Sequence, residues 1–338
     1  MNLNMKEFKE ELKSGNIRPL YVFYGEEGYL REYYLSELKK QVVGDMMPEF
    51  NLTVINHAPE FNELSDVVES YPAMNDRRLV IVRDFDVLSA NADFSEKAEK
   101  LFADMPEHCV LVFVYGNIEY KPDKRRKLYK VMEKHGAAVN FAKASRTDLI
   151  SWIKRRFLAS DKDISNETAD FLLFYCGEIM QQLIPEIEKI SSYARKREIT
   201  RADIETVATR NVSSAVFDAA NAVAEKKYAK ALSVLEELEA RNEKPIPVLA
   251  LIAQQFRRLY ATKLIMERGG GKNEVMELLD MKSDYPARLA ITAARSVKKE
   301  NICRAIELSA RADAQLKFGG GWEVLSQLIA SISAEEKR

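Results

Sequence analysis

The sequence predicts an α/β domain with a doubly wound parallel sheet, followed by two all-helical domains. Up to residue 141, short apolar runs alternate with helical patterns, which is the βαβα order of a parallel sheet. After residue 141 the helical patterns continue without strands. A chain of 338 residues is long enough for two or three domains. We expect an α/β domain over residues 1–142, a small helical domain over 143–210 and a larger one over 211–338.

Five apolar runs in the first domain predict its strands. They span residues 20–24, 52–56, 79–83, 110–115 and 137–141. Most are continuously apolar rather than alternating, which indicates parallel strands covered by helices on both faces. Between them, apolar residues recur every four positions over 30–43, and a second helical pattern covers 124–134. Both segments are expected to be helices.

The remainder of the chain is expected to be helical. The small domain has helical patterns over 147–158, 166–176, 181–195 and 200–207, the last with Thr200 as its N-cap. Prolines and two glycine triplets, at 269–271 and 319–321, separate the later helices. The segment 247–267 carries apolar residues on two stripes, so we expect it to be buried within a bundle or between subunits.

Composition excludes several classes of protein. Hydrophobic residues make up 46% and charged residues 30% of the chain, and the net charge is −1. These values are typical of a globular protein, and they restrict any nucleic-acid contact to a local surface. The three cysteines and three histidines have no metal-ligand spacing, so no metal is expected. With no apolar run of the ~18 residues that a membrane span needs, we expect a cytoplasmic protein without membrane contact.

The turn after the first predicted strand has the shape of a phosphate-binding loop. Its residues are Gly25, Glu26, Glu27 and Gly28. A working loop reads G-x-x-x-x-G-K-[ST], and the Lys-Ser/Thr pair is absent here. Two carboxylates before a helix N-terminus would favour its dipole and repel a nucleotide. The pattern therefore predicts a degenerate loop that holds no nucleotide and no other cofactor.

The strand over 79–83 is followed by Asp84. An acid in this place is typical of a strand that binds magnesium beside a nucleotide, but ordinary strand termination also explains it. Without the lysine of the phosphate loop, such a site has no nucleotide to serve.

Six segments, in order along essentially the whole chain, carry a family resemblance. They are PLYVFYGEEGYLREYYLSELKK, YPAMNDRRLVIVRDFDVL, VLVFVYGNIEYKPDKRRKLYKVMEKHGAAVNF, TDLISWIKRRF, SSAVFDAANAVAEKKYAKALSVLEELEARNEKPIPVLALIAQQFRRLY and ARADAQLKFGGG. With these segments the chain resembles the delta subunit of bacterial DNA polymerase III. That family is the part of the clamp loader that binds and opens the ring-shaped sliding clamp.

The resemblance implies an AAA+-like fold: an α/β domain without a functional nucleotide site, a helical lid and a helical collar. It implies a hetero-pentamer with motor and delta prime subunits, and a sliding clamp (beta subunit) and primer-template DNA as partners in DNA replication. The delta subunit would have no ATPase or polymerase activity of its own. It would belong to a DNA-directed DNA polymerase holoenzyme, a nucleotidyltransferase complex.

The resemblance also places the clamp contact before the third predicted strand. The family has a hydrophobic pair there, often Leu-Phe or two aromatics. Here the matching stretch offers Met74 with Ala73 beside it, and Tyr71 as a third candidate. The chain departs from the pattern because Ala73 offers little surface to bury, whereas binding energy usually concentrates in large side chains. The alternative is that Met74 covers the end of the sheet.

Two groups of basic residues are candidates for DNA or subunit contact. Residues 121–134 hold seven basic and two acidic side chains. The candidates are Lys124, Arg125, Arg126 and Lys127 there, and Arg257 and Arg258 further on. A solvated helix face is the alternative for the first group, whereas contact with phosphates would be insensitive to base sequence. For the second pair, flanking apolar residues favour a subunit interface.

Three other functions are alternatives to the delta subunit. An AAA+ DNA-dependent ATPase motor subunit would need a Lys-Ser/Thr pair after the first strand. The delta prime subunit in its familiar form carries a Ser-Arg-Cys motif and a zinc-binding cysteine cluster, and the sequence has neither. A helical scaffold unrelated to replication would not need the AAA+-like first domain.

Overall fold

The computed structural model describes residues 2–3, 5–44, 47–281 and 284–335 of the chain. The chain divides into two compact units, Met1–Ala144 and Ser145–Arg338, and each is described by itself. The further division of the second unit into lid and collar stays a prediction.

The first unit is built on a six-stranded sheet with the order β1-β6-β2-β5-β4-β3. Its strands are β1 (Asn2–Leu3), β2 (Leu20–Tyr24), β3 (Leu52–Ile55), β4 (Arg78–Arg83), β5 (Cys109–Val114) and β6 (Ala137–Asn140). Every pairing is parallel. The predicted parallel sheet is confirmed with all five expected strands. The edge strand β1 was not predicted, because two residues are too short to form a pattern.

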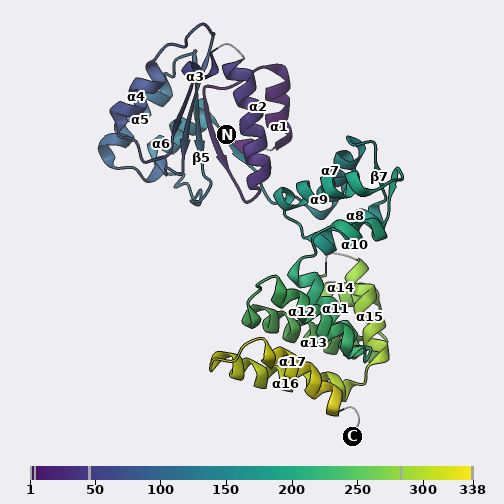
Figure 1. The fold of residues 1–338 in the computed structure, drawn as a ribbon. Helices are drawn as coiled ribbons and strands as arrows, with labels where there is room; N and C mark the ends of the chain where they lie inside the picture. Colours follow the sequence, from purple (N-terminus) through teal and green to yellow (C-terminus); the bar gives the residue numbers. More distant parts are fainter. Residues whose placement is uncertain (1, 4, 45–46, 282–283, 336–338) are drawn as a thin grey trace. The chain divides into compact units, whose positions relative to one another are not determined.

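Helices cover both faces of this sheet, as Figure 1 shows. On one side lie α1 (Met5–Ser14) and α2 (Gly28–Val43), and on the other α4 (Phe61–Glu69), α5 (Ala92–Ala103) and α6 (Lys127–His135). In β2, Tyr21 and Phe23 belong to the core beneath α1 and α2. Leu20 and Val22 belong to the core beneath α4, α5 and α6. Two buried faces explain why the strands are continuously apolar. The doubly wound α/β arrangement is therefore confirmed.

Between the sheet elements lie the short helix α3 (Pro48–Asn51) and a 3₁₀ turn over Val87–Ser89. Both were missed, because helices of three or four residues have no periodicity to detect.

The second unit begins with four helices. They are α7 (Arg146–Leu158), α8 (Asn166–Cys176), α9 (Met180–Tyr193) and α10 (Arg201–Val207). Thr200 forms a capping box, in which its amide donates to the Asp203 carboxylate at 2.8 Å and the Asp203 amide donates to the Thr200 hydroxyl at 3.3 Å. The expectation that strands end after residue 141 was wrong in one detail: β7 (Asp163–Ile164) and β8 (Glu198–Ile199) pair in parallel. Each strand is too short to form a recognisable sequence pattern.

The described residues of this unit form seven further helices. They are α11 (Val212–Ala224), α12 (Tyr228–Ala240), α13 (Pro245–Glu267), α14 (Lys272–Leu278), α15 (Asp284–Ser296), α16 (Lys299–Lys317) and α17 (Glu323–Glu335). Helix α13 packs against α11, α15 and α16. Most of its apolar residues are buried there, but Leu264 of the second stripe is exposed. The glycine triplets end α13 and α16, with Gly269 and Gly319 at positive φ. None of the helices in the described ranges is long and apolar enough to cross a membrane.

The Thr200 capping box gives a stability prediction. Thr200→Ala removes the acceptor for the Asp203 amide, so we expect the free energy of unfolding to fall by about 1 kcal/mol. Urea denaturation measures it, with Lys196→Ala at a nearby exposed position as the control. An equal loss in both variants would contradict the role of the cap.

Candidate functional site

The segment between α4 and β4 exposes two large side chains. Tyr71 is 83% exposed and Met74 73% exposed, whereas Ala73 is half-buried. Apolar side chains this exposed and this close together are candidates for a binding surface. A methionine that covered the end of the sheet would be more buried than Met74 is.

Asn51, the last residue of α3, fixes the backbone of this segment. Its side chain is fully buried. The Asn51 Nδ2 donates to the Ala73 carbonyl at 2.9 Å, and the Ala73 amide donates to Asn51 Oδ1 at 2.7 Å. One carboxamide therefore satisfies both polar groups of one residue, and Ala73 has little freedom to move. The role of Asn51 is not predictable from the sequence, because no local pattern connects it to a segment 22 residues away.

Asn75 fixes the other side of Met74. Its Nδ2 lies 3.0 Å from the Val42 carbonyl and 2.8 Å from the Val43 carbonyl, both at the end of α2. It also lies 2.8 Å from the Arg77 carbonyl. Met74 thus stands between two anchored residues, and its φ of 53° is in the left-handed region. Such a conformation is uncommon for a residue other than glycine, and persists where the surroundings enforce it.

Tyr71 and Arg78 complete the segment. The Tyr71 ring stacks on His108, with ring centres 4.6 Å apart, so one face of the ring is supported while most of it stays exposed. The buried Arg78 donates from Nη1 to the Ser70 carbonyl at 3.1 Å and from Nη2 to the Thr53 hydroxyl at 2.9 Å. Both ends of the segment are therefore held to the sheet.

The loop of Gly25, Glu26, Glu27 and Gly28 lies at the start of α2 and uses its polar groups internally. The Glu27 amide donates to the Phe141 carbonyl at 2.9 Å, and the Gly28 amide donates to the Glu26 carbonyl at 3.1 Å. These are two of the amides that a phosphate-binding loop would offer to an anion. Gly25 has φ +121°, and a Cβ there would lie 2.4 Å from the Phe141 oxygen, so only glycine fits.

Glu27 of this loop is buried, and so is the neighbouring Arg31. The Arg31 Nη1 donates to the Gly25 carbonyl at 2.8 Å, which places its guanidinium against the loop backbone. Burial raises the pKa of Glu27, and the Tyr29 amide and Lys143 partly offset this. The loop backbone is therefore held by Arg31, and Glu27 is a buried acid of the loop itself.

Asp84 follows β4 and caps the turn after β5. Its carboxylate accepts from the Gly116 and Asn117 amides, both at 2.7 Å, and from Asn117 Nδ2 at 2.6 Å. Burial raises its pKa, but the hydrogen bonds from Asn117 and Gly116 outweigh this and lower the pKa below its usual value. These contacts give Asp84 a structural role as a turn cap.

Metal coordination has no support from the described part of the chain. Within it, no three His, Cys, Asp or Glu side chains gather closely enough to hold a metal ion.

The first basic group is only partly available on the surface. Lys124, Arg125 and Lys127 are exposed, and Arg125 pairs with Asp123 at 3.1 Å. Arg126 instead points inward, with its Nη2 3.2 Å from the Ser95 hydroxyl. It therefore helps to fix the turn before α6.

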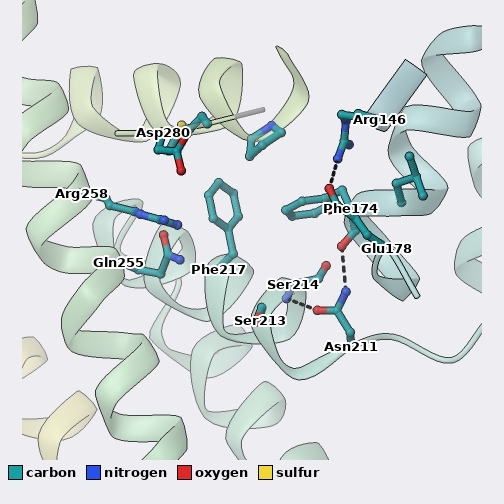
Figure 2. Close-up of a pocket in the computed structure, with 13 residues that line it drawn as sticks. Arg146, Phe174, Glu178, Asn211, Ser213, Ser214, Phe217, Gln255, Arg258 and Asp280 are labelled. Carbon is teal, nitrogen blue, oxygen red and sulfur yellow. Dashed lines mark hydrogen bonds and ion pairs between the residues drawn. The ribbon is translucent and has the colours of Figure 1, made fainter. Parts of the chain in front are cut away.

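Arg257 and Arg258 have different environments. Arg257 is exposed, whereas Arg258 lines a pocket of about 260 Å³ together with Gln255 and Phe217. Across this pocket lies Arg146, whose guanidinium is bound to Glu178 at 2.6 Å (Figure 2). Arg257 and Arg258 therefore do not form one cationic site.

Comparison with known proteins gives one consistent family. Residues 21–142 match the family described as DNA polymerase III, delta subunit, and residues 213–328 match DNA polymerase III delta subunit, C-terminal domain.

Individual relatives are similar along almost their whole length. The DNA polymerase III subunit delta of Bacillus subtilis (strain 168) is 28% identical, over 92% of this chain and 91% of the relative. A similarly named protein of Aquifex aeolicus (strain VF5) is 24% identical over 92% and 90%. The solved structure of the Bacillus subtilis DNA clamp loader delta protein aligns with a TM-score of 0.58 and 25% identity, covering 97% of this chain and 99% of that one.

The Asn51–Ala73 contact gives a second stability prediction. In Asn51→Ala the amide and carbonyl of Ala73 lose a buried partner, so we expect the free energy of unfolding to fall by about 1–3 kcal/mol. Urea denaturation measures the change. The exposed Asn56 provides the control, and Asn56→Ala should have little effect. A similar loss in both variants would contradict the specific role of Asn51.

The lowered pKa of Asp84 gives a prediction on pH. A carboxylate with a lowered pKa in the folded state stabilises the fold above the unfolded pKa, and this stabilisation is lost as pH falls through the folded pKa. Asp84→Asn should therefore be less stable than the wild type at pH 7, and the difference should shrink below about pH 4, near the ordinary aspartate pKa. Urea denaturation at both pH values checks this. A difference that stays constant with pH would contradict it.

Proposed function

We infer that this chain, which belongs to the DNA polymerase III delta subunit family, grips a sliding clamp and holds it open for loading onto primed DNA. In this proposal the contact is made by Met74 with Ala73 and Tyr71. The observation that carries it is the exposure of Met74 on a backbone that Asn51 and Asn75 fix on both sides.

An exposed apolar side chain on a fixed backbone is well suited to this role. Binding costs free energy when loops and side chains must be ordered at the interface, and a contact that is already ordered avoids much of that cost. Methionine is flexible beyond its Cβ and adapts to the shape of a pocket. The rigid backbone therefore sets the position of the contact, while the thioether side chain adjusts to the clamp.

We further propose that the chain hydrolyses no ATP itself. The amides of Glu27 and Gly28 already donate to carbonyls of the chain, and Arg31 lies against the loop. A nucleotide would have to displace these contacts and meet Glu26 and Glu27 without the lysine that a motor subunit uses. ATP would instead bind neighbouring motor subunits and control when the clamp contact becomes accessible.

The other partners follow from the same proposal. Residues 211–338 would assemble with the motor and delta prime subunits into the collar of a hetero-pentamer. The exposed Lys124, Arg125 and Lys127 would contact primer-template phosphates or an acidic neighbouring subunit, with an affinity that falls as salt rises. The complex would work in the cytoplasm.

Clamp binding tests the proposal directly. The purified chain should bind the purified sliding clamp of its own organism without nucleotide, and Met74→Ala should weaken binding about tenfold, or about 1.4 kcal/mol. Isothermal titration calorimetry measures both. Leu158→Ala, at an exposed position of the second unit, is the control and should bind like the wild type. Absence of binding by the wild type would refute the function, and unchanged binding by Met74→Ala would refute the contact.

A further inference from the structure

We propose that Phe50 of α3 supplies the second large apolar side chain of the clamp contact, so that the contact is formed by two separate segments. This inference rests on the proposed clamp binding by Met74. It supplies a second large side chain near Met74, where Ala73 offers only a methyl group.

Phe50 is available for binding. Its side chain is 61% exposed, and that of Met47, at the N-cap of the same short helix, is 45% exposed. A buried phenylalanine side chain covers about 150–250 Å², far more than the methyl group of Ala73 can offer. Exposing two apolar side chains within four positions to water costs free energy, and burial against a partner surface would remove that cost.

Phe50 and Met74 belong to the same end of the sheet. Helix α3 immediately precedes β3, and the segment of Met74 precedes β4. These strands are parallel neighbours, with Leu52 opposite Leu79. The residues just before these strands therefore lie at the same end of the sheet, where Figure 1 places α3.

The carboxamide of Asn51 then fixes the two segments to each other. It makes both hydrogen bonds to the backbone of Ala73. Phe50 is the neighbour of Asn51 and Met74 is the neighbour of Ala73, so each lies one residue, about 3.8 Å along the chain, from the joined pair. Within α3, the Phe50 amide donates to the Met47 carbonyl at 3.1 Å.

This arrangement gives Ala73 and Met74 separate tasks. Ala73 contributes its backbone to the link with Asn51, and Met74 contributes its side chain to the partner. The second side chain then comes from across the link, as Phe50. A hydrophobic pocket of the partner would here receive two large side chains from two segments that Asn51 holds together. Aromatic residues are frequent among the side chains that dominate binding.

The test measures clamp affinity for five forms of the full chain: wild type, Phe50→Ala, Phe50→Leu, Met74→Ala and Phe318→Ala. Phe318 is the matched control, since it is a phenylalanine that is 93% exposed in the second unit. Titration calorimetry with the purified clamp of the same organism, without nucleotide, gives the dissociation constants. We expect Phe50→Ala to weaken binding about tenfold and Phe318→Ala to leave it unchanged. Phe50→Leu, which keeps an apolar side chain, should recover most of the affinity.

The outcomes separate this inference from the proposed function. If Met74→Ala weakens binding and Phe50→Ala does not, the function stands and the role of Phe50 is refuted. If Phe50→Ala and Phe318→Ala weaken binding equally, the effect is not local and the inference is again refuted. If the wild type does not bind the clamp, both proposals fail. Because Phe50 is exposed, its variants should keep the thermal midpoint of the wild type, which circular dichroism checks.

Discussion

The pair of hydrogen bonds between Asn51 and Ala73 is the interaction on which the candidate surface depends. A fully buried carboxamide must find partners for its N–H and its oxygen, and here it finds both in one residue of another segment. These hydrogen bonds join the short helix α3 to the segment before β4. Met74 follows this joined pair, with a left-handed backbone and an exposed side chain.

The turn at Gly25 illustrates the opposite use of backbone polar groups. In a nucleotide-binding loop the amides are left free for phosphate. Here they donate to carbonyls of Phe141 and Glu26, and Arg31 donates to Gly25. These contacts link the turn after β2 to α2 and to Phe141, which follows β6. The clamp contact that we propose lies at the opposite end of the same sheet.

The sequence predicted those features that depend on periodicity. The five longer strands, the doubly wound arrangement and the N-cap at Thr200 all follow from local patterns, and the family resemblance agrees with the comparisons. It could not predict β1, β7 and β8, because paired strands of two residues have no pattern of their own. Asn51 was missed for a different reason: its partner Ala73 lies in the segment before the neighbouring strand, which only the fold brings close. Phe50 was missed with it, because its importance depends on the same link. Arg126 was grouped with exposed basic residues, but its contact with Ser95 depends on tertiary packing.

Hydrogen–deuterium exchange of the chain, alone and with the sliding clamp, tests the central claim most directly. That claim is that α3 and the segment before β4 act together as one preformed surface. We expect peptides covering residues 47–51 and 70–78 to gain protection together when the clamp is added, while residues 25–31 stay unchanged. Protection of 70–78 alone would contradict a joint surface. Protection confined to other parts of the chain would contradict the location of the contact itself.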